Sequence, residues 1–172
     1  MAFSVEPSGI PEVPPTGPPA GAVTALALAK ARAVAAARPA GDAAVVLGAD
    51  TEVVLDGRLL GKPADPDAAV RMLQALRGRW HEVVTGVAAV ETAGERRERT
   101  GAVTTRVRMS DAADAEIAAY VATGEPFDKA GGYAVQGLGA SLVAEVDGCY
   151  TNVVGLPVET TRRMLQGLGL SV

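Results

Sequence analysis

One aspartate in this chain stands in a sequence context that suits catalysis. Asp50 ends the short apolar run of residues 43–49, and such a run is typical of a strand buried on both faces. We therefore expect its carboxylate at the carboxyl end of a buried strand, where α/β sheets place their ligands. A carboxylate there could bind Mg²⁺ or deprotonate a water molecule. Thr51 would face the other side of the strand, or reach the ligand if the strand ends there. The alternative role of Asp50, a helix N-cap, is disfavoured because residues 51–57 indicate a strand and a hairpin.

The lysines form a second set of candidates, because only three of the sixteen basic residues are lysines. Lys30 lies on the apolar face of a predicted helix, Lys62 lies in a Gly-Lys-Pro sequence, and Lys129 lies in Asp-Lys-Ala-Gly-Gly. Lysine supplies a compact point charge with three rotatable donors, whereas arginine supplies a planar fork. The three positions favour one polyanionic ligand bound by ammonium groups. Chance retention of three surface lysines is the alternative.

A glycine-rich segment carries the remaining candidates. Residues 125–140 contain few strand formers and several glycines, so they predict an ordered loop in which the backbone can approach a ligand closely. Asp128 and Lys129 lie in this segment, as does Gln136, whose amide offers both a donor and an acceptor for the edge of a base. A tight turn without a ligand would explain the glycines equally well. On local grounds Glu12 is a solvated side chain of the proline-rich start.

Composition excludes several classes of function. The net charge of −4 argues against a general nucleic-acid-binding surface. His81 is the single histidine, so a histidine cluster cannot hold a metal, and Cys149 is the single cysteine, so no internal disulfide forms. The start of the chain has neither the basic nor the apolar part of a secretory signal, and no apolar run reaches the length of a membrane span. We expect a cytoplasmic protein that binds neither nucleic acid nor membrane.

The hydrophobic pattern predicts an α/β fold. Residues 4–20 contain six prolines and indicate an irregular lead-in. Thr24 is the expected cap of the first helix, Asp65 and Pro66 are expected to open the second, and Asp56-Gly57 is a strong hairpin signal. The predicted helices span 24–38, 66–77, 111–122 and 157–168, and the predicted strands span 43–49, 52–55, 58–60, 82–91, 103–109 and 141–146.

Five stretches of the sequence together carry a resemblance to a known family. They are Val-Leu-Gly-Ala-Asp-Thr (46–51), Gly-Lys-Pro (61–63), His-Glu-Val-Val-Thr-Gly-Val (81–87), the long block 120–137 and Asn-Val-Val-Gly-Leu-Pro (152–157). In this order they resemble the Maf family of nucleoside triphosphate pyrophosphatases. The resemblance implies a mixed central sheet flanked by helices, with two lobes around a cleft, similar to the inosine triphosphate pyrophosphatases. It also implies hydrolysis of a nucleoside triphosphate to the monophosphate and pyrophosphate with a divalent cation, Mg²⁺ or Mn²⁺.

The resemblance also implies a role for each candidate residue. Asp50 matches the family's proton acceptor, and both it and Glu12 match positions near the metal. Thr51 and Gln136 match positions associated with choice of the base, and Gln136 in Val-Gln-Gly is similar to the subgroup that acts on dTTP and UTP. The phosphate-binding lysines of the family match Lys30, Lys62 and Lys129. Asp128 matches a motif position that we assign to substrate binding.

One departure from the family concerns the N-terminus. Family members begin with a strand and a serine-rich turn ending in Pro-Arg-Arg, and nothing like it precedes Phe3. We therefore expect residues 1–172 to form a single Maf-like domain that is N-terminally truncated relative to the family. The alternative to an enzyme is a catalytically impaired nucleotide-binding remnant, or an interaction protein linked to septum formation and division. The resemblance also makes a homodimer plausible.

Overall fold

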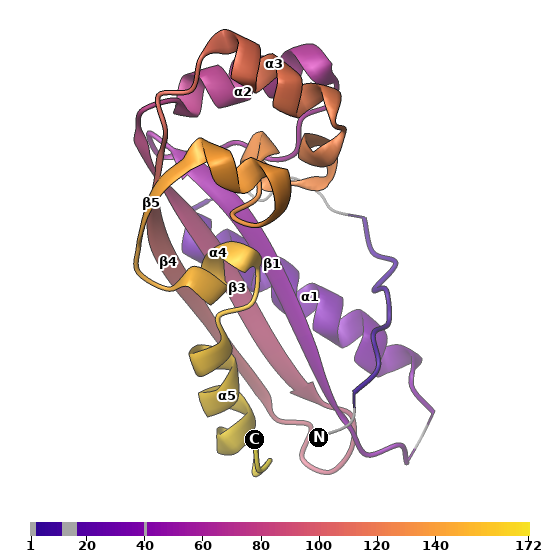
Figure 1. The fold of residues 1–172 in the computed structure, drawn as a ribbon. Coiled ribbons are helices and arrows are strands. Elements are labelled where there is room, and N and C mark those ends of the chain that lie inside the picture. The colour runs from indigo at the N-terminus through magenta and orange to yellow at the C-terminus, as the bar shows by residue number, and fades with distance from the viewer. Residues whose placement is uncertain (1–2, 12–16, 40) are drawn as a thin grey trace. The chain divides into compact units, whose positions relative to one another are not determined.

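The computed structural model of the protein describes residues 3–11, 17–39 and 41–172 (Figure 1). These residues form a five-stranded sheet in the order β2-β1-β3-β4-β5, with helices beside it. The prediction of a mixed α/β fold with a helix-flanked sheet is therefore confirmed. The elements are α1 (Pro19–Ala37), β1 (Val45–Leu55), β2 (Arg58–Leu59), α2 (Pro66–Leu76), β3 (Trp80–Glu91), β4 (Glu98–Met109), α3 (Asp114–Ala122), three short 3₁₀ helices (Glu125–Asp128, Ala130–Gly132 and Gly137–Leu142), β5 (Val143–Asp147), α4 (Tyr150–Val154) and α5 (Val158–Gly167).

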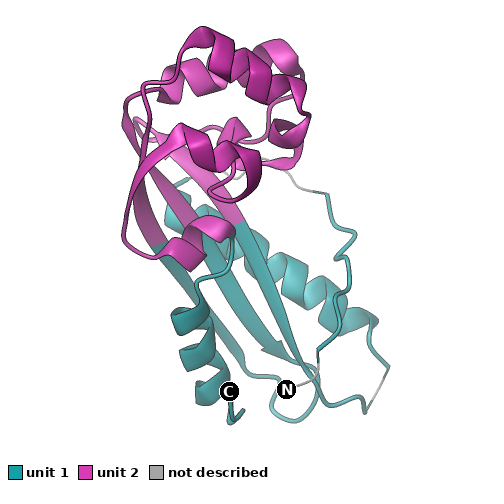
Figure 2. Ribbon diagram, viewed as in Figure 1, with its two compact units in different colours: residues 1–50, 85–103, 155–172 teal, residues 51–84, 104–154 magenta. Residues whose placement is uncertain are grey.

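The chain divides into two compact units (Figure 2). Unit 1 comprises residues 1–50, 85–103 and 155–172, and unit 2 comprises residues 51–84 and 104–154. The long strands β1, β3 and β4 contribute residues to both units. A single Maf-like domain over residues 1–172 remains a prediction.

In unit 1 the strand β3 is covered on both faces. Ala88 and Val90 pack with α1, whereas Val87 and Ala89 pack with α5, as expected from the alternation of side chains along a strand. In Figure 1, α1 passes behind the strands and α5 lies in front of them. This two-sided burial explains why residues 83–90 form an unbroken buried run.

Two glycines let α1 approach the strands closely. A Cβ atom on Gly86 would lie 2.4 Å from the backbone carbonyl carbon of Val23, and one on Gly48 would lie 2.3 Å from the carbonyl oxygen of Ala27. By length and composition alone α1 could cross a membrane, since its mean hydropathy is 1.4. In the structure 22% of this stretch is buried, and its small buried residues Ala27 and Ala31 pack with Ala88 and Val90 of β3.

The first helix begins five residues earlier than Thr24, the cap that the sequence suggested, so that prediction was wrong. Pro19 occupies the first turn and Pro18 is the N-cap, because a proline at the start of a helix lacks only an N–H that would have no partner there. Thr24 instead lies inside the helix, where its hydroxyl donates to the carbonyl of Ala20 at 2.6 Å.

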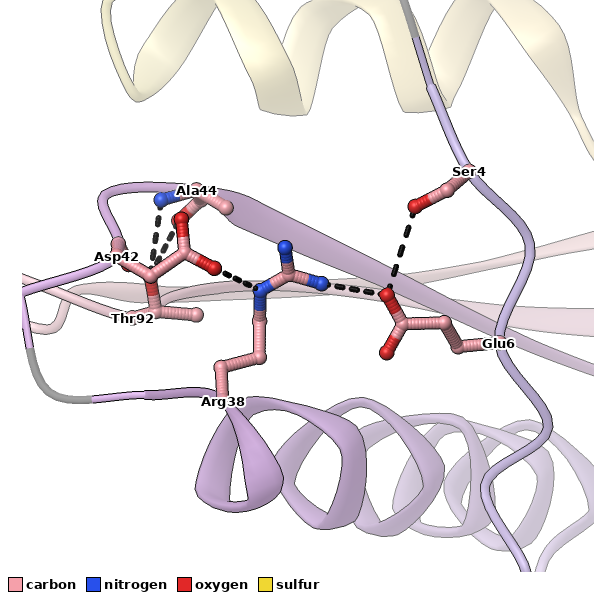
Figure 3. A network of polar contacts seen from close by, with 6 residues as sticks. All are labelled: Ser4, Glu6, Arg38, Asp42, Ala44 and Thr92. Atoms are coloured by element: carbon pink, nitrogen blue, oxygen red, sulfur yellow. Dashed lines mark hydrogen bonds and ion pairs between the residues drawn. The ribbon is translucent and has the colours of Figure 1, made fainter.

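The C-terminal end of α1 is tied to the N-terminal segment by a network of charges (Figure 3). The guanidinium of Arg38 donates to Glu6 at 2.6 Å and to Asp42 at 2.8 Å. Thr92 joins the same region, since its hydroxyl accepts from the backbone N–H of Ala44 at 2.9 Å. The network fixes the irregular lead-in against α1 within unit 1.

Strand β1 is longer than the sequence suggested, and this changes the position of Asp50. We expected the strand to end at Ala49, but it continues from Val45 to Leu55. Asp50 therefore lies in the middle of a strand rather than at its carboxyl end. The β-branched residues of Thr-Glu-Val-Val extend the strand. The carboxylate of Asp50 is tolerated inside the strand because the ammonium of Lys30 binds it.

In unit 2 the predicted hairpin and the second helix are confirmed. Asp56 and Gly57 have φ of 51° and 75°, the two left-handed residues of a tight hairpin turn, and Val54 pairs with Leu59. The side chain of Asp65 caps α2 by accepting from the N–H of Ala68 at 2.7 Å. The core of this unit joins the strands to α2 and α3, and its members include Val53, Leu55, Leu73, Leu76, Val83, Val107, Ile117 and Val121.

The second half of the chain follows the prediction with local shifts. Strand β4 begins at Glu98 rather than residue 103, and Glu98 is held by Arg32 of α1 through bonds of 2.8 and 2.6 Å. Residues 125–140 form an ordered loop, as expected, with short 3₁₀ helices inside it. Helix α4 was not predicted. The terminal helix begins after Pro157, as the sequence indicated.

Candidate active site

The carboxylate of Asp50 and the ammonium of Lys30 form the central pair of the candidate site. Lys30 Nζ donates to Asp50 Oδ1 at 2.9 Å, and both side chains are largely buried, with 18% and 9% of their surface exposed. The other carboxylate oxygen, Oδ2, is buried, and no described residue donates a hydrogen bond to it. A buried carboxylate oxygen requires a partner, so Oδ2 is the atom of this pair that suits a water molecule or a cation.

The close packing of α1 brings the pair together. Lys30 lies one turn beyond Ala27, whose carbonyl stands over Gly48, and Ala31 packs over the same glycine. Gly48 precedes Asp50 by two residues on β1. The closest approach of α1 to β1 therefore lies beside the ion pair of Lys30 and Asp50. Side chains at Gly48 or Gly86 would push the helix away. Sequence reasoning selected Lys30 and Asp50 but missed these two glycines, whose only signal was a small residue inside a strand pattern.

In unit 2 Lys129 binds Asp128, and the charge of Lys62 also acts on this carboxylate. Lys129 Nζ donates to Asp128 Oδ1 at 2.6 Å. This bond, together with a smaller effect of the charge of Lys62, lowers the pKa of Asp128. The Gly-Lys-Pro segment and the glycine-rich loop are joined by a hydrogen bond from the N–H of Gly131 to the carbonyl of Gly61 at 2.8 Å. The structure thus places two predicted phosphate-binding lysines in one region of this unit.

Gln136 lies on the glycine-rich loop with its side chain exposed. Its backbone is extended, with φ of −120° and ψ of 166°, and it precedes the 3₁₀ helix Gly137–Leu142. The loop around it is organised by Glu125, whose carboxylate accepts from the N–H groups of Leu138 at 3.1 Å and Gly139 at 2.9 Å. Sequence reasoning gave Glu125 no role, because nothing local marks a carboxylate that binds amides 13 and 14 residues away.

A buried polar pair anchors the same loop on β3. His81 Nε2 and the hydroxyl of Tyr133 share a hydrogen bond of 2.6 Å, and the two rings meet edge to face with centroids 5.4 Å apart. Burial lowers the pKa of His81 to about 4, against a smaller opposing effect of the Arg79 backbone. Burial raises the pKa of Tyr133. Both groups are therefore neutral near pH 7, and their hydrogen bond joins the loop to β3.

The predicted site residues fall into two sets. Lys30 and Asp50 belong to unit 1, whereas Thr51, Lys62, Asp128, Lys129 and Gln136 belong to unit 2. Thr51 is half-buried on β1. Glu12 lies outside the described residues.

The donor set available for a cation is small. Among the residues that the structure describes, no three His, Cys, Asp or Glu side chains gather as a metal site would require. The buried oxygen Asp50 Oδ2 remains as one carboxylate ligand. Mg²⁺ is usually held by one or two carboxylates together with substrate phosphates and water. Among the described residues, Asp50 could therefore supply one ligand to such a cation.

Comparison with known proteins identifies the family of this chain. Residues 1–168 match the family model described as Maf-like protein. A dTTP/UTP pyrophosphatase of Gloeobacter violaceus is 52% identical over 91% of this chain and 80% of its own length. Proteins of the same name from Moorella thermoacetica and Pelotomaculum thermopropionicum are 52% and 46% identical over 100% of this chain, and over 87% and 88% of their own lengths. With nearly all of its residues matched, the chain belongs to the Maf-like protein family.

Proposed function

We propose that this protein hydrolyses dTTP and UTP to the nucleoside monophosphate and pyrophosphate. The observation that carries the proposal is the state of Asp50. One of its oxygens is bound by Lys30, and the other is buried without a described donor. Relatives covered over most of their length bear the name dTTP/UTP pyrophosphatase, which supports this substrate class.

Asp50 acts as the general base in this proposal. Its Oδ2 accepts a proton from a water molecule, whose oxygen forms a bond to the α-phosphorus. The bond between the α-phosphorus and the bridging oxygen breaks, and the electron pair leaves with pyrophosphate. Lys30 orients the carboxylate by binding Oδ1, so that the two lone pairs of Oδ2 remain, one for the water and one for the cation. Positioning of this kind is a large part of catalysis in phosphoryl transfer.

The three lysines supply positive charge for the phosphates. Lys62 and Lys129 are proposed to bind the phosphate oxygens, together with Lys30, and to offset the charge that develops on the leaving pyrophosphate. Asp128 holds the ammonium of Lys129 at 2.6 Å. We assign Asp128 to substrate binding through this contact, since it sets where the lysine points.

We propose Mg²⁺ or Mn²⁺ as the cofactor, with Asp50 as a ligand. Glu12 is the second proposed carboxylate ligand, on sequence resemblance. Bound with the triphosphate, such a cation supplies Lewis-acid polarisation of the phosphate oxygens.

Base selection is assigned to Thr51 and Gln136. Thymine and uracil present an N3–H donor beside the O4 acceptor, and a glutamine amide can bind both groups with its oxygen and its nitrogen. The exposed side chain of Gln136 on an ordered loop suits this role.

We also propose the cytoplasm as the compartment, because nucleoside triphosphates are made and used there. The one cysteine, Cys149, is free.

The test is release of pyrophosphate from dTTP, UTP, CTP, GTP and ATP, each with Mg²⁺ or Mn²⁺. We expect turnover of dTTP and UTP well above that of the other three. Asp50→Asn should lower the rate of pyrophosphate release by a factor of about 10² to 10⁴, which is the usual contribution of a general base. A folded protein that releases no pyrophosphate from any of the five nucleotides would refute the proposal.

A further inference from the structure

The glycine-rich loop is closed by a single carboxylate at its start. Glu125 Oε2 accepts from the N–H of Leu138 at 3.1 Å, and Oε1 accepts from the N–H of Gly139 at 2.9 Å. The hydroxyl of Tyr120 donates to the same carboxylate at 3.1 Å. Glu125 thereby joins the start of the loop to its far end and connects both to α3. The three donors leave the carboxylate little freedom to move.

The space around this carboxylate is tightly filled. A Cβ atom on Gly137 would lie 3.0 Å from Glu125 Oε2, and one on Gly139 would lie 2.7 Å from the Tyr120 hydroxyl oxygen. Gly137 also has a φ of 74°, a conformation that side chains disfavour. The backbone of the loop thus folds directly onto the carboxylate. Hydrogen bonding to Gly139, first among several effects, lowers the pKa of Glu125, so it is ionised at neutral pH.

Gln136 lies between two fixed points of this loop. On one side Val135 is buried, and its carbonyl accepts from the Tyr150 hydroxyl at 3.4 Å. On the other side Leu138 is bound by Glu125. The side chain of Gln136 itself is exposed. Its backbone is therefore set by its neighbours while its amide stays available to a ligand.

Discrimination between pyrimidines demands such control of position. Cytosine presents an N3 acceptor and an amino donor where thymine presents a donor and an acceptor. A glutamine whose backbone can shift adjusts its amide to either base, since the amide carries both a donor and an acceptor. Selectivity requires that the recognising group be held within about 0.5 Å of its productive place by its supporting residues.

We propose that Glu125 is a positioning residue for base discrimination. Its carboxylate holds the backbone of residues 134–139 and thereby places Gln136, without touching the nucleotide. The inference rests on the proposed pyrimidine substrate and extends it to a residue outside the site assigned above.

The experiment measures binding of dTMP and dCMP, which are not hydrolysed, by titration calorimetry. Glu125→Gln keeps the shape of the side chain but replaces one acceptor oxygen by a donor that cannot accept an amide N–H. We expect the preference for dTMP over dCMP to fall roughly tenfold, as for the loss of one well-placed hydrogen bond. Glu145→Gln, which alters an exposed ion pair with Arg108 in the same unit, should leave the preference unchanged.

A double-variant cycle separates positioning from general loosening. In a Gln136→Ala background, Glu125→Gln should change the preference no further, because its effect passes through Gln136. Tyr120→Phe, which removes one donor to the carboxylate, provides a second variant and should lower the preference in the same direction by a smaller factor.

The inference is overturned if the wild type binds both monophosphates equally, if Glu125→Gln and Tyr120→Phe both keep the preference, or if the two changes multiply in the double variant. Pyrophosphate release by the wild type is measured alongside. If the wild type releases no pyrophosphate but prefers dTMP, and Glu125→Gln removes that preference, the proposed hydrolysis is refuted and this inference is supported.

Discussion

Protonation of one buried histidine should control the stability of unit 2 in mild acid. His81 is the only histidine of the chain, and burial holds its pKa at about 4, below the ordinary value of 6.5. As the pH falls, the unfolded chain therefore takes up the proton before the folded protein does. The free energy of unfolding must then fall with pH between these two values. Between pH 7.5 and 5.0 the expected loss is about 2 kcal/mol.

The window is favourable because it lies above the ordinary pKa values of carboxyl groups, about 3.9 for Asp and 4.3 for Glu. Every described carboxyl group with a resolved shift has its pKa moved downward, so each remains ionised at pH 5; these are Glu91, Glu98, Asp114, Glu125, Asp128 and Glu159. Most of their contribution to stability is lost at lower pH, between the ordinary pKa of each group and its lowered pKa in the folded state. The change between pH 7.5 and 5.0 thus comes mainly from His81.

The assay is urea unfolding at the two pH values, followed by the fluorescence of Trp80, the single tryptophan. The matched variant is His81→Phe with Tyr133→Phe, which removes both partners of the buried hydrogen bond; removal of both can be nearly neutral. It should lose less than about 0.5 kcal/mol over the same pH range. Tyr133→Phe alone keeps the titrating ring and should keep the pH dependence. The reasoning is refuted if the double variant loses as much stability as the wild type does.

Three further predictions concern the packing of α1, the cap of α2 and the pair of Lys30 and Asp50. Gly86→Ala should destabilise the protein by about 1–3 kcal/mol in urea unfolding, because the new methyl group would overlap the backbone of Val23; unchanged stability would show that α1 does not pack as described. Asp65→Ala removes the cap of α2 and should cost about 1 kcal/mol in the same assay, whereas no loss would mean that the cap is not formed. Lys30→Gln should lower turnover of dTTP about 100-fold, since Asp50 loses the ammonium group that binds its carboxylate. Turnover at the wild-type rate would show that Lys30 has no role in the reaction.

The parts of the fold that the sequence predicted are those decided by local chemistry. The Asp56-Gly57 turn needs two residues that tolerate positive φ, and the cap at Asp65 needs a short side chain with an acceptor oxygen before a proline. Both signals lie within four residues of the structure that they specify. The first helix was placed wrongly because two residue types compete to start it, and proline at position 19 prevailed over Thr24.

The site was predicted as a set of residues, but not as an arrangement. Lys30 and Asp50 were chosen from their chemistry, yet their contact depends on how closely α1 lies against the strands. That distance is set by the absence of side chains at Gly48 and Gly86, which no periodicity reveals. The role of Glu125 was hidden for a similar reason, because its partners are backbone amides far along the chain.

The most direct test of the central claim follows the oxygen of the attacking water. Hydrolysis of dTTP in water enriched in ¹⁸O, with Asp50→Asn as the control, shows which phosphorus is attacked. Attack at the α-phosphorus assisted by Asp50 predicts one labelled oxygen in dTMP, unlabelled pyrophosphate, and almost no product from the variant. Label in the pyrophosphate, release of orthophosphate, or turnover that survives in Asp50→Asn would contradict the account.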